Sequence, residues 1–390
     1  MEVVSLVAHR VRVRLKRSVK HASFVRRESE NLIVSCQLSD GKIGYGEGVP
    51  RDYVTGETID GTIELLKASE LKRQLGYAHD FETVVKHAGA LTLAEVPGDD
   101  RRCRGNAARC AVELAYLDAF GRSLGEPLMN VTTRIAPQLA EPRERVQYSG
   151  IILSAKGWKA RLAALGYRVT GFGQVKVKVG IAGHDDARRM RVIRRCVGSK
   201  VELRVDANEA WTTSNALDKL RSIEPYRIAA VEQPVPHADI AAMKDIKLQC
   251  PIPIQLDESL CSMVDAERAI RGGYSDRWNL RLSKCGGFIP SLKLAAFAAE
   301  RGVGYQLGCQ VGETGILSAA GRHFATSVRG LLALEGSFDR HLLAELLTKE
   351  DITFGSRGGW APMIAASGTG VRVDPARLDA NTVHREVLIG

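Results

Sequence analysis

QVKVKVG, residues 174–180, is the first of five short apolar segments that carry charged side chains at or near their carboxyl ends. The other four follow at intervals of about 25 residues: ELRVDAN (202–208), AAVEQPV (229–235), IQLDESL (254–260) and NLRLSKCGG (279–287). One strand plus one helix needs such an interval, so the segments are expected to be neighbouring parallel strands. Their carboxyl ends would then open on one face, where the charged side chains converge.

Three acidic side chains, Asp206, Glu232 and Asp257, stand at the ends of three successive segments. Crowded carboxylates raise one another's pKa and are costly to bury without a cation. Oxygen ligands suit a hard cation such as Mg²⁺, whereas His or Cys ligands would favour zinc or iron. One such carboxylate alone is more often a helix cap or a loop hydrogen-bonding group. Three in register predict a Mg²⁺ site, and with it an enzyme.

Two lysines, Lys176 and Lys178, point to the same side of the first segment, because residues two apart on a strand share a face. The positive charge of each disfavours the charge of the other, which prepares the outer one, Lys178, to act as a neutral base. A metal-bound carboxylic acid has an acidified α-proton, because the developing enolate charge falls on the cation. The predicted substrate is therefore a small carboxylic acid that loses its α-proton to Lys178.

Three further polar residues each have two interpretations. Asn208 would orient Asp206 or cap the next helix. Glu258 would be a fourth acid near the metal or an ion-pair partner of a nearby lysine, and the ion pair is favoured. Glu313 would hydrogen-bond the substrate or cap the helix that begins at Gly315.

From about residue 145 onward, strand patterns alternate with helical ones such as HDDARRMRVIRRCVG (184–198). A closed parallel barrel needs apolar strands of this kind because they are buried on both sides, and its chemistry lies at their carboxyl ends. An open doubly wound sheet is the alternative, but it would not gather five consecutive strand ends around one point. We predict an α/β fold, a modified TIM barrel of the form (β/α)7β, with strands at 147–153, 174–179, 201–206, 229–233, 253–257, 278–282, 304–309 and 331–335.

The chain before the barrel predicts a separate N-terminal α+β capping domain. Residues 1 to about 55 alternate in strand fashion, with SDGK (39–42) as a hairpin turn, and are expected to form a three-stranded meander. Helical spacing follows, and the C-terminal tail has one short strand pattern that should pack back on this domain. The predicted division is 1–130 for the capping domain, 131–355 for the barrel and 356–390 for the C-terminal segment.

The composition narrows the classes of function. The net charge of +10 comes from basic residues spread along helices, so we expect no nucleic-acid partner and at most a mild attraction for anionic substrates. There is no run of 18 apolar residues and no recognisable signal peptide, so no membrane span is expected. The eight cysteines are scattered without metal-ligand spacing, which favours reduced thiols in a cytoplasmic protein.

The order of the motifs resembles the enolase superfamily, and within it the muconate-lactonizing-enzyme subgroup of mandelate racemase and muconate cycloisomerase relatives. The motifs are KxK, D-x-N, V-E-Q-P, L-D-E-S and N-L-x-L-x-K-x-G-G, together with GYGEG (44–48) and ARCAVELAYLDAFGRSLGEPL (108–128). The resemblance implies Mg²⁺ ligands at Asp206, Glu232 and Asp257, and Lys178 as the acid/base with Lys176 beside it. It also implies isomerase or lyase chemistry and a homo-oligomer.

The sequence departs from the family at Arg281. The family's second catalytic lysine follows the N-[IL] of the sixth strand, where this chain has Arg281, and Lys284 lies three residues later at a position that is usually not catalytic. Racemases and epimerases of the subgroup use two lysines on opposite faces of the substrate, whereas arginine is a poor base but a strong positive pole. With Lys178 as the single base, we expect cycloisomerase or syn-dehydratase chemistry in which Arg281 holds the enolate. The alternatives are a racemase or epimerase of N-acylamino acids or dipeptides and, more remotely, a non-catalytic metal-binding barrel.

Substrate specificity is expected from loops around the barrel mouth. The Asp-x-Asp pair with which dipeptide epimerases of the family bind an ammonium group is missing from LALEGSFDRHLL (332–343), although Glu335 and Asp339 are available. Side chains in KHASFVRRESEN (20–31) and GVPRDYVTGET (48–58), including Arg51 and Tyr53, would bind a polar or anionic group of the substrate or be structural surface residues.

Overall fold

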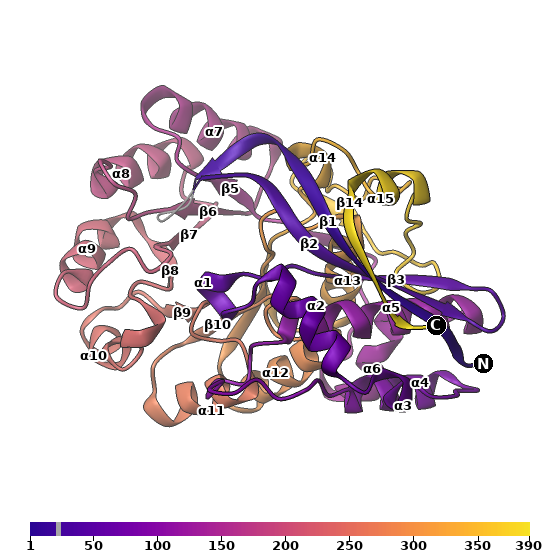
Figure 1. Ribbon diagram of the computed structural model, residues 1–390. Coiled ribbons are helices and arrows are strands. Elements are labelled where there is room, and N and C mark those ends of the chain that lie inside the picture. Colours follow the sequence, from indigo (N-terminus) through magenta and orange to yellow (C-terminus); the bar gives the residue numbers. More distant parts are fainter. Residues whose placement is uncertain (21–24) are drawn as a thin grey trace.

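The computed structural model describes residues 1–20 and 25–390 and consists of an α/β barrel beside an antiparallel sheet with its own helices (Figure 1). Residues 21–24 of the predicted substrate loop at 20–31 lie outside the described residues. In the described chain, eight parallel strands follow one another in chain order around the barrel: β5 (Gly150–Ile152), β6 (Gln174–Lys178), β7 (Glu202–Asp206), β8 (Ile228–Glu232), β9 (Ile254–Leu256), β10 (Arg277–Leu280), β11 (Gly304–Leu307) and β12 (Leu331–Leu334).

Within the same described residues, seven helices connect these strands: α7 (Gly157–Thr170), α8 (Asp186–Val197), α9 (Ala216–Ile223), α10 (Ala242–Gln249), α11 (Met263–Gly272), α12 (Phe288–Glu300) and α13 (Gly315–Ser327). They lie outside the ring of strands (Figure 1). The predicted (β/α)7β barrel is therefore confirmed, and all eight predicted strands are present.

The barrel strands are apolar because they are covered from both sides. Val175 and Val177 on β6, and Leu203 and Val205 on β7, have no exposed surface. The alternating position between the two valines is Lys176, which is also buried. The period of two thus separates an apolar outer layer from polar side chains inside the barrel.

The first and last strands of the barrel meet at a backbone hydrogen bond. The N–H of Ser149 donates to the carbonyl oxygen of Leu334 over 2.8 Å. The side chain of Gln174 adds a bond to the carbonyl oxygen of Leu332, also at 2.8 Å. These bonds close the ring, so the carboxyl ends of the strands open together on one face, as predicted.

The N-terminal sheet contains the predicted meander. Its strands are β1 (Val3–Lys20), β2 (Val25–Leu38) and β3 (Ile43–Gly48), which pair in antiparallel fashion. The C-terminal strand β14 (Thr382–Ile389) pairs antiparallel with β1, so the tail does pack on this sheet. The domain boundaries at 130 and 355 remain a prediction.

The described residues between β3 and the barrel form six α-helices: α1 (Asp52–Thr55), α2 (Ile59–Ala68), α3 (Leu71–Gln74), α4 (Phe81–Ala90), α5 (Asn106–Leu124) and α6 (Val131–Ile135). Of these, α2, α3 and α5 contact strands of the sheet (Figure 1). Two further helices, α14 (Asp339–Leu342) and α15 (Pro375–Asn381), follow the barrel. The short strand β13 (Trp360–Pro362) pairs with β4 (Arg145–Gln147), which precedes the barrel.

The GYGEG segment lets β3 contact α5 backbone to backbone. A Cβ atom on Gly46 would lie 2.0 Å from the carbonyl oxygen of Ala111, and one on Gly44 would lie 2.1 Å from the backbone nitrogen of Ala119. Any side chain at these positions would force the helix away from the sheet. The helix residues at the contact are all alanine: Ala107, Ala111, Ala115 and Ala119.

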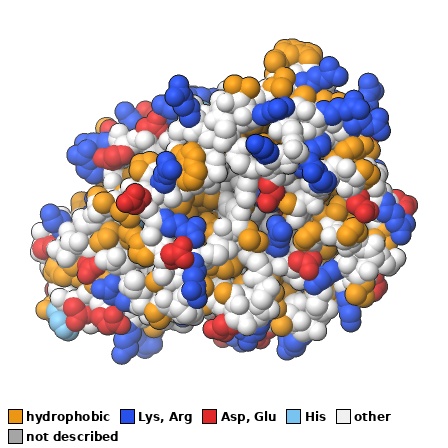
Figure 2. Space-filling model, turned by 180° about the vertical axis from the view of Figure 1, so that it is seen from behind, with side chains coloured by type: hydrophobic (Ala, Val, Ile, Leu, Met, Phe, Trp, Pro, Cys, Tyr) orange, Lys and Arg blue, Asp and Glu red, His pale blue; other side chains and the backbone are white. Residues whose placement is uncertain are grey.

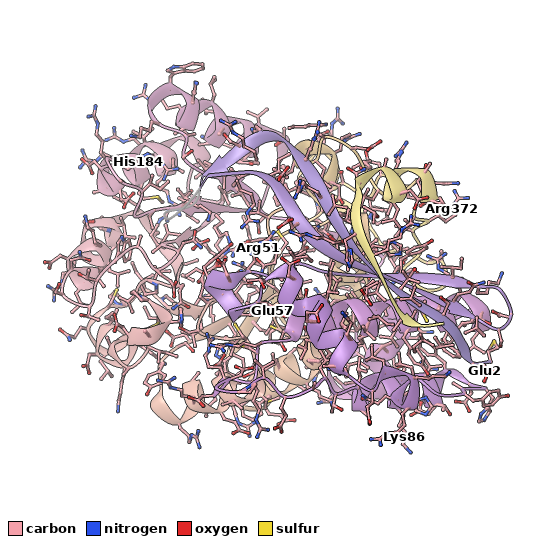
Figure 3. The ribbon with its side chains drawn as sticks, viewed as in Figure 1. Glu2, Arg51, Glu57, Lys86, His184 and Arg372 are labelled. Atoms are coloured by element: carbon pink, nitrogen blue, oxygen red, sulfur yellow. The ribbon has the colours of Figure 1, made fainter. Side chains whose placement is uncertain are left out.

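Two buried charged residues join the N-terminal sheet to the loop between β11 and α13. The Glu47 carboxylate accepts hydrogen bonds from the N–H groups of Thr314 at 2.9 Å and Leu317 at 3.1 Å. Arg51 donates to the carbonyl oxygen of Val311 at 2.7 Å and lies near the centre of the molecule (Figure 3). Of the two interpretations of Arg51, the structural one is therefore correct, although its position is buried rather than at the surface.

Basic side chains are spread over the surface rather than gathered in one tract. Figure 2 shows Lys and Arg side chains scattered over one face among acidic and apolar ones. The net charge of +10 therefore has no single focus on this face.

The contact between β3 and α5 gives a stability prediction. Gly46→Ala should lower the free energy of unfolding by at least about 2 kcal/mol, because the added methyl group overlaps fixed backbone atoms. Gly76→Ala is the matched control, since a Cβ at Gly76 meets no atom within 4 Å. Urea unfolding of both variants measures the difference, and equal stabilities would contradict the close contact.

Candidate active site

The centre of the barrel holds Lys176 surrounded by carboxylates. Its Nζ lies 2.5 Å from Glu335 Oε2 and 3.4 Å from oxygens of Asp206 and Glu232. Burial alone would lower the pKa of Lys176, but Glu232, Glu335 and Asp206 raise it above its ordinary value. Lys176 therefore stays charged because carboxylates surround it, and the expectation that the neighbouring lysine lowers its pKa is wrong.

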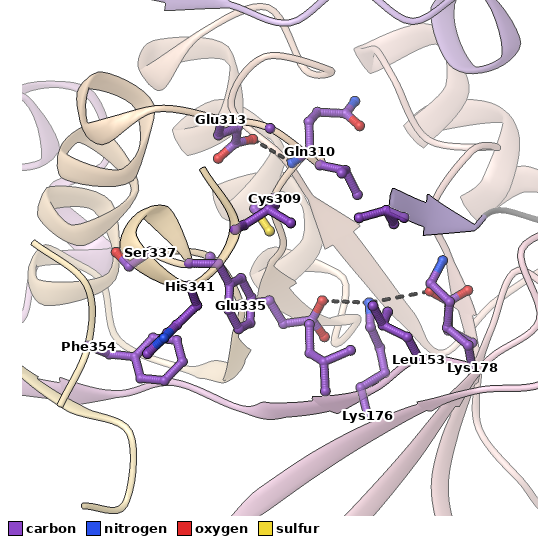
Figure 4. A pocket seen from close by; sticks show the side chains of 18 of the residues that line it. Leu153, Lys176, Lys178, Cys309, Gln310, Glu313, Glu335, Ser337, His341 and Phe354 are labelled. Carbon is purple, nitrogen blue, oxygen red and sulfur yellow. Dashed lines mark hydrogen bonds and ion pairs between the residues drawn. The ribbon is translucent and has the colours of Figure 1, made fainter. Parts of the chain in front are cut away.

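Lys178 lies one layer above Lys176, at the mouth of the barrel. It ends β6, in register with Asp206 on β7 and, through β7, with Glu232 on β8. Its Nζ donates to the Oδ1 of Asn208 and lines a cavity at the carboxyl ends of the strands (Figure 4). Lys178 thus occupies the position that a base needs to reach a ligand in the cavity.

Asn208 organises the side chains around Lys178. Its backbone N–H donates to Asp206 Oδ1 at 3.0 Å, and its Nδ2 lies 3.3 Å from Glu258 Oε1. Helix α9 begins eight residues later with Asn215 as its N-cap, so Asn208 orients Asp206 and does not cap the helix.

Glu232 and Asp257 are held by polar neighbours inside the barrel. Glu232 accepts hydrogen bonds from Asn279 Nδ2 at 2.8 Å and from Gln255 Nε2 at 2.9 Å. Burial raises the pKa of Glu232 to about 8; Lys176 opposes the shift, and neighbouring carboxylates add to it. Burial would also raise the pKa of Asp257, but two cations, Arg281 first and then Lys284, hold it below its usual value.

Arg281 and Lys284 have different surroundings. Lys284 is fully buried and donates to Asp257 Oδ1 at 2.9 Å and to the carbonyl oxygens of Asp257 at 2.6 Å and Asn279 at 2.8 Å. Arg281 lines the cavity, forms an ion pair with Asp257 and donates to Gln310 Oε1 at 3.2 Å. Arg281 and not Lys284 therefore shares the cavity with Lys178.

The donor set fits Mg²⁺, but the described side chains do not enclose an ion. Asp206, Glu232 and Asp257 supply hard oxygen ligands from three neighbouring strands, and Glu258 Oε2 is buried with no hydrogen-bond partner among the described atoms. Across residues 1–20 and 25–390, no group of three or more His, Cys, Asp or Glu side chains is arranged to hold a metal. Arg281 Nη2 contacts Asp257 and lies 3.6 Å from Glu232 Oε1, between two of the predicted ligands.

The cavity above these residues has a volume of about 700 Å³. This volume suits a small-molecule ligand. It is lined by the last residues of β1, by Tyr53, by the ends of the barrel strands and by the loop after β12. Polar residues of the lining include Lys176, Lys178, Asp206, Asn208, Glu258, Arg281, Gln310, Glu313 and Glu335.

Glu313 lies on the cavity wall, and Thr314 is the residue that caps α13. The Glu313 carboxylate accepts the backbone N–H of Gln310 at 2.5 Å (Figure 4). Burial raises the pKa of Glu313 to about 8. The capping interpretation of Glu313 is therefore wrong, and a role toward the substrate remains a prediction.

Sequence reasoning missed a layer of polar residues below the site. Arg204 bonds Glu335 at 2.9 Å and Ser149 at 2.9 Å, while Gln255 and Asn279 bond Glu232. Each of these three stands two positions before a predicted site residue on its strand, so the period-two rule that joined Lys176 to Lys178 also identifies them. Glu335, considered for binding an ammonium group, instead pairs with Lys176 and Arg204.

A parallel barrel with acids, lysine and arginine at the carboxyl ends of its strands is an enzyme architecture. The family model described as "Enolase C-terminal domain-like" matches residues 159–377, more than half of the chain. The chain belongs to this family, and the predicted resemblance to the enolase superfamily is confirmed.

Relatives of known activity are isomerases. The chain is 28% identical over 394 residues to an N-succinyl-L-Arg/Lys racemase of Bacillus cereus, with all of both chains covered. It is 29% identical over 341 residues to a hydrophobic dipeptide epimerase of Enterococcus faecalis, covering 85% of this chain and 89% of that one.

Solved structures give the same grouping. The crystal structure of the Bacillus cereus racemase superposes with a TM-score of 0.85 at 27% identity, covering 99% of this chain and all of the other. The dipeptide epimerase of Enterococcus faecalis, complexed with Mg and L-Leu-L-Tyr, superposes with a TM-score of 0.79 at 26% identity, covering 95% of this chain and 99% of the other. The chain is accordingly similar to racemases and epimerases.

None of the helices formed by residues 1–20 and 25–390 combines the length and the hydropathy that crossing a membrane requires.

The environments of the two lysines predict different effects of removing them. Lys176→Met should lower the free energy of unfolding by about 3–5 kcal/mol, because it leaves buried carboxylates without their cation. Lys178→Met, at the cavity surface, should change stability by about 1 kcal/mol or less. Chemical denaturation measures both, and equal losses would contradict the assignment of Lys176 as the structural cation.

Proposed function

We propose that the protein is a Mg²⁺-dependent isomerase that exchanges the α-proton of an N-acylated amino acid, with Lys178 as the base. The main support for this proposal is that Lys178 and Arg281 line one cavity above three carboxylates at the ends of barrel strands. Similarity to racemases and epimerases favours this reaction over the cycloisomerase or syn-dehydratase chemistry first expected.

The proposed roles follow from position. Asp206, Glu232 and Asp257 would hold Mg²⁺ once Arg281 turns from the two acids that it contacts toward Gln310, its other partner. Bound Mg²⁺ would supply positive charge to the substrate carboxylate and its enolate. Lys178 would take the α-proton in its neutral form, with Asn208 fixing its ammonium group afterwards.

Arg281 belongs on the side of the substrate opposite Lys178. β6 and β10 are four strands apart in an eight-stranded ring, so their ends face each other across the barrel. Burial alone would lower the pKa of Arg281, but Asp257 and the neighbouring glutamates raise it well above its usual value. Arg281 would therefore stabilise the enolate and, as a poor acid and base, return a proton to the α-carbon only slowly on the face opposite Lys178, where the resulting neutral guanidine regains its proton from solvent.

The pairing of the acids in and near the cavity favours a substrate whose amine is acylated over one with a free ammonium group. Glu335 is already paired with Lys176 and Arg204, and Asp339 is buried outside the cavity lining. Glu313 and Glu258, whose Oε2 has no hydrogen-bond partner among the described atoms, remain as acceptors for a substrate N–H group. Glu313→Gln should lower kcat/KM by less than about tenfold if it accepts an uncharged amide, because a neutral acceptor survives.

Stereochemistry tests the assignment of Lys178 and Arg281. In deuterated water, the enantiomer of an N-acylated amino acid whose α-proton faces Lys178 should exchange about 10²-fold or more faster than its mirror image, measured by NMR. Lys178→Ala should remove about 10²–10⁴-fold of this exchange. Arg281→Lys should speed exchange of the slow enantiomer, because it supplies a second base.

Equal exchange of both enantiomers by the native protein would overturn the role of Arg281. Exchange with complete retention and no racemisation would instead support the second candidate function, one-base elimination or cycloisomerisation. Arg281 favours this candidate because it leaves Lys178 as the single base. If no carboxylic acid exchanges its α-proton, the proposed function is wrong.

Metal binding can be tested without turnover. Mg²⁺ at about 100 times its Kd should stabilise the protein by about 2.7 kcal/mol, seen as a higher Tm. Asp257→Asn and Glu232→Gln should lose this stabilisation, whereas Glu64→Gln, on the exposed face of α2, should keep it. A Mg²⁺ effect of equal size in all three variants would place the ion elsewhere.

A further inference from the structure

One end of the cavity is built from aromatic side chains around Phe354. Its ring centroid lies 5.2 Å from that of Phe338, 5.8 Å from that of His341 and 6.0 Å from that of Phe172. Tyr167 continues the cluster, 4.9 Å from Phe172. All five rings line the cavity, and we call them the aromatic cup: Tyr167, Phe172, Phe338, His341 and Phe354.

The aromatic cup is separate from the reacting end of the cavity. Tyr167 comes from α7, whereas His341 comes from α14 and Phe354 from the loop after it. In Figure 4, His341 and Phe354 lie on one side of Glu335, and Lys178 lies on the other. A substrate held at Lys178 therefore reaches the cup with a part remote from the proton that moves.

The charges near the cup are positive. Lys16 and Arg17 of β1 line the same cavity, and Lys16 donates to the carbonyl oxygen of Arg340 at 2.6 Å. Burial lowers the pKa of His341, and Arg340, Lys16 and Arg17 lower it further. Of the nearby acids, Asp351 is paired with Arg340 at 3.1 Å, and Asp339, whose carboxylate oxygens have no hydrogen-bond partner among the described atoms, is buried and is not among the cavity-lining residues.

We propose that the aromatic cup binds a bulky, uncharged apolar group of the substrate, aromatic or large aliphatic, and rejects a cationic one. Ring faces and edges contribute to binding mainly through apolar area, which an aromatic or leucine-sized group covers best. A lysine- or arginine-like group would meet Lys16 and Arg17 instead of a carboxylate. This inference rests on the proposed function and separates the chain from the N-succinyl-L-Arg/Lys racemase that it resembles.

The test is a substrate series. For α-proton exchange with Mg²⁺ present, N-acetyl-phenylalanine and N-acetyl-leucine should have kcat/KM about 100-fold above N-acetyl-alanine, and N-acetyl-lysine should not exceed N-acetyl-alanine. A second series with alanine at the reacting carbon compares acetyl with benzoyl as the acyl group. A preference for the large apolar group in either series supports the cup and says which part of the substrate enters it. The proposal is overturned if N-acetyl-lysine or N-acetyl-alanine has the highest kcat/KM of the first series and the benzoyl group gives no increase in the second.

A variant locates the effect in the cup. Phe338→Ala should lower kcat/KM for the preferred apolar substrate by at least about tenfold, while changing the alanine substrate by less than threefold. Phe338→Leu should retain most of the preference, which controls for folding. Trp158→Ala, an exposed aromatic on α7 that is not among the cavity-lining residues, should change neither substrate. Equal losses on both substrates in Phe338→Ala would count against a binding role.

Failure of the cup and failure of the reaction are distinguishable. If no substrate exchanges its proton, calorimetry with N-acetyl-phenylalanine and N-acetyl-alanine still compares their binding in the presence of Mg²⁺. Tighter binding of the phenylalanine derivative, lost in Phe338→Ala, supports the cup without the proposed reaction. Equal binding overturns it.

Discussion

The charge of Lys176 is the constraint on which the site depends. Asp206, Glu232 and Glu335 contact its Nζ in the barrel centre, where the cost of unpaired charge is high. Arg204 supplies a second cation to Glu335 from below. Without these two cations the acids could not be buried side by side, and the carboxyl ends of β7 and β8 would have to spread. Lys176 and Arg204 thus hold in place the buried acids that lie beneath the cavity.

The sequence was sufficient for the parts of the structure that repeat. The strand-plus-helix interval predicted the eight barrel strands, and the acids at strand ends were correctly placed around one opening, since parallel strands share an orientation. GYGEG was recognised only as a family motif, although the reason for its glycines is contact with the alanines of α5. That reason requires knowing which helix covers the strand, and local sequence does not encode it.

Side-chain pairing was less predictable than side-chain placement. Lys176 was expected to act on Lys178, yet carboxylates from three other strands determine its charge. Glu335 was available in the sequence for a substrate ammonium group but is consumed by Lys176 and Arg204. Glu313 was equally ambiguous until Thr314 proved to be the helix cap. For Lys176 and Glu335 the partners lie far away in the chain, and only closure of the barrel brings them near.

The meeting of Ser149 and Leu334 determines where the barrel opens most easily. Neighbouring strands such as β5 to β8 share ladders of hydrogen bonds. In the described chain, by contrast, one backbone hydrogen bond joins Ser149, the residue before β5, to Leu334 at the end of β12. Local unfolding follows the least bonded boundary, so amide protons at this seam should belong to the first cooperative unit to exchange with solvent. Tyr148, which stacks on Phe354 at 5.3 Å, adjoins one side of the seam, and Glu335 adjoins the other. The boundary between the first and last strands and the wall of the ligand cavity thus share the same few residues.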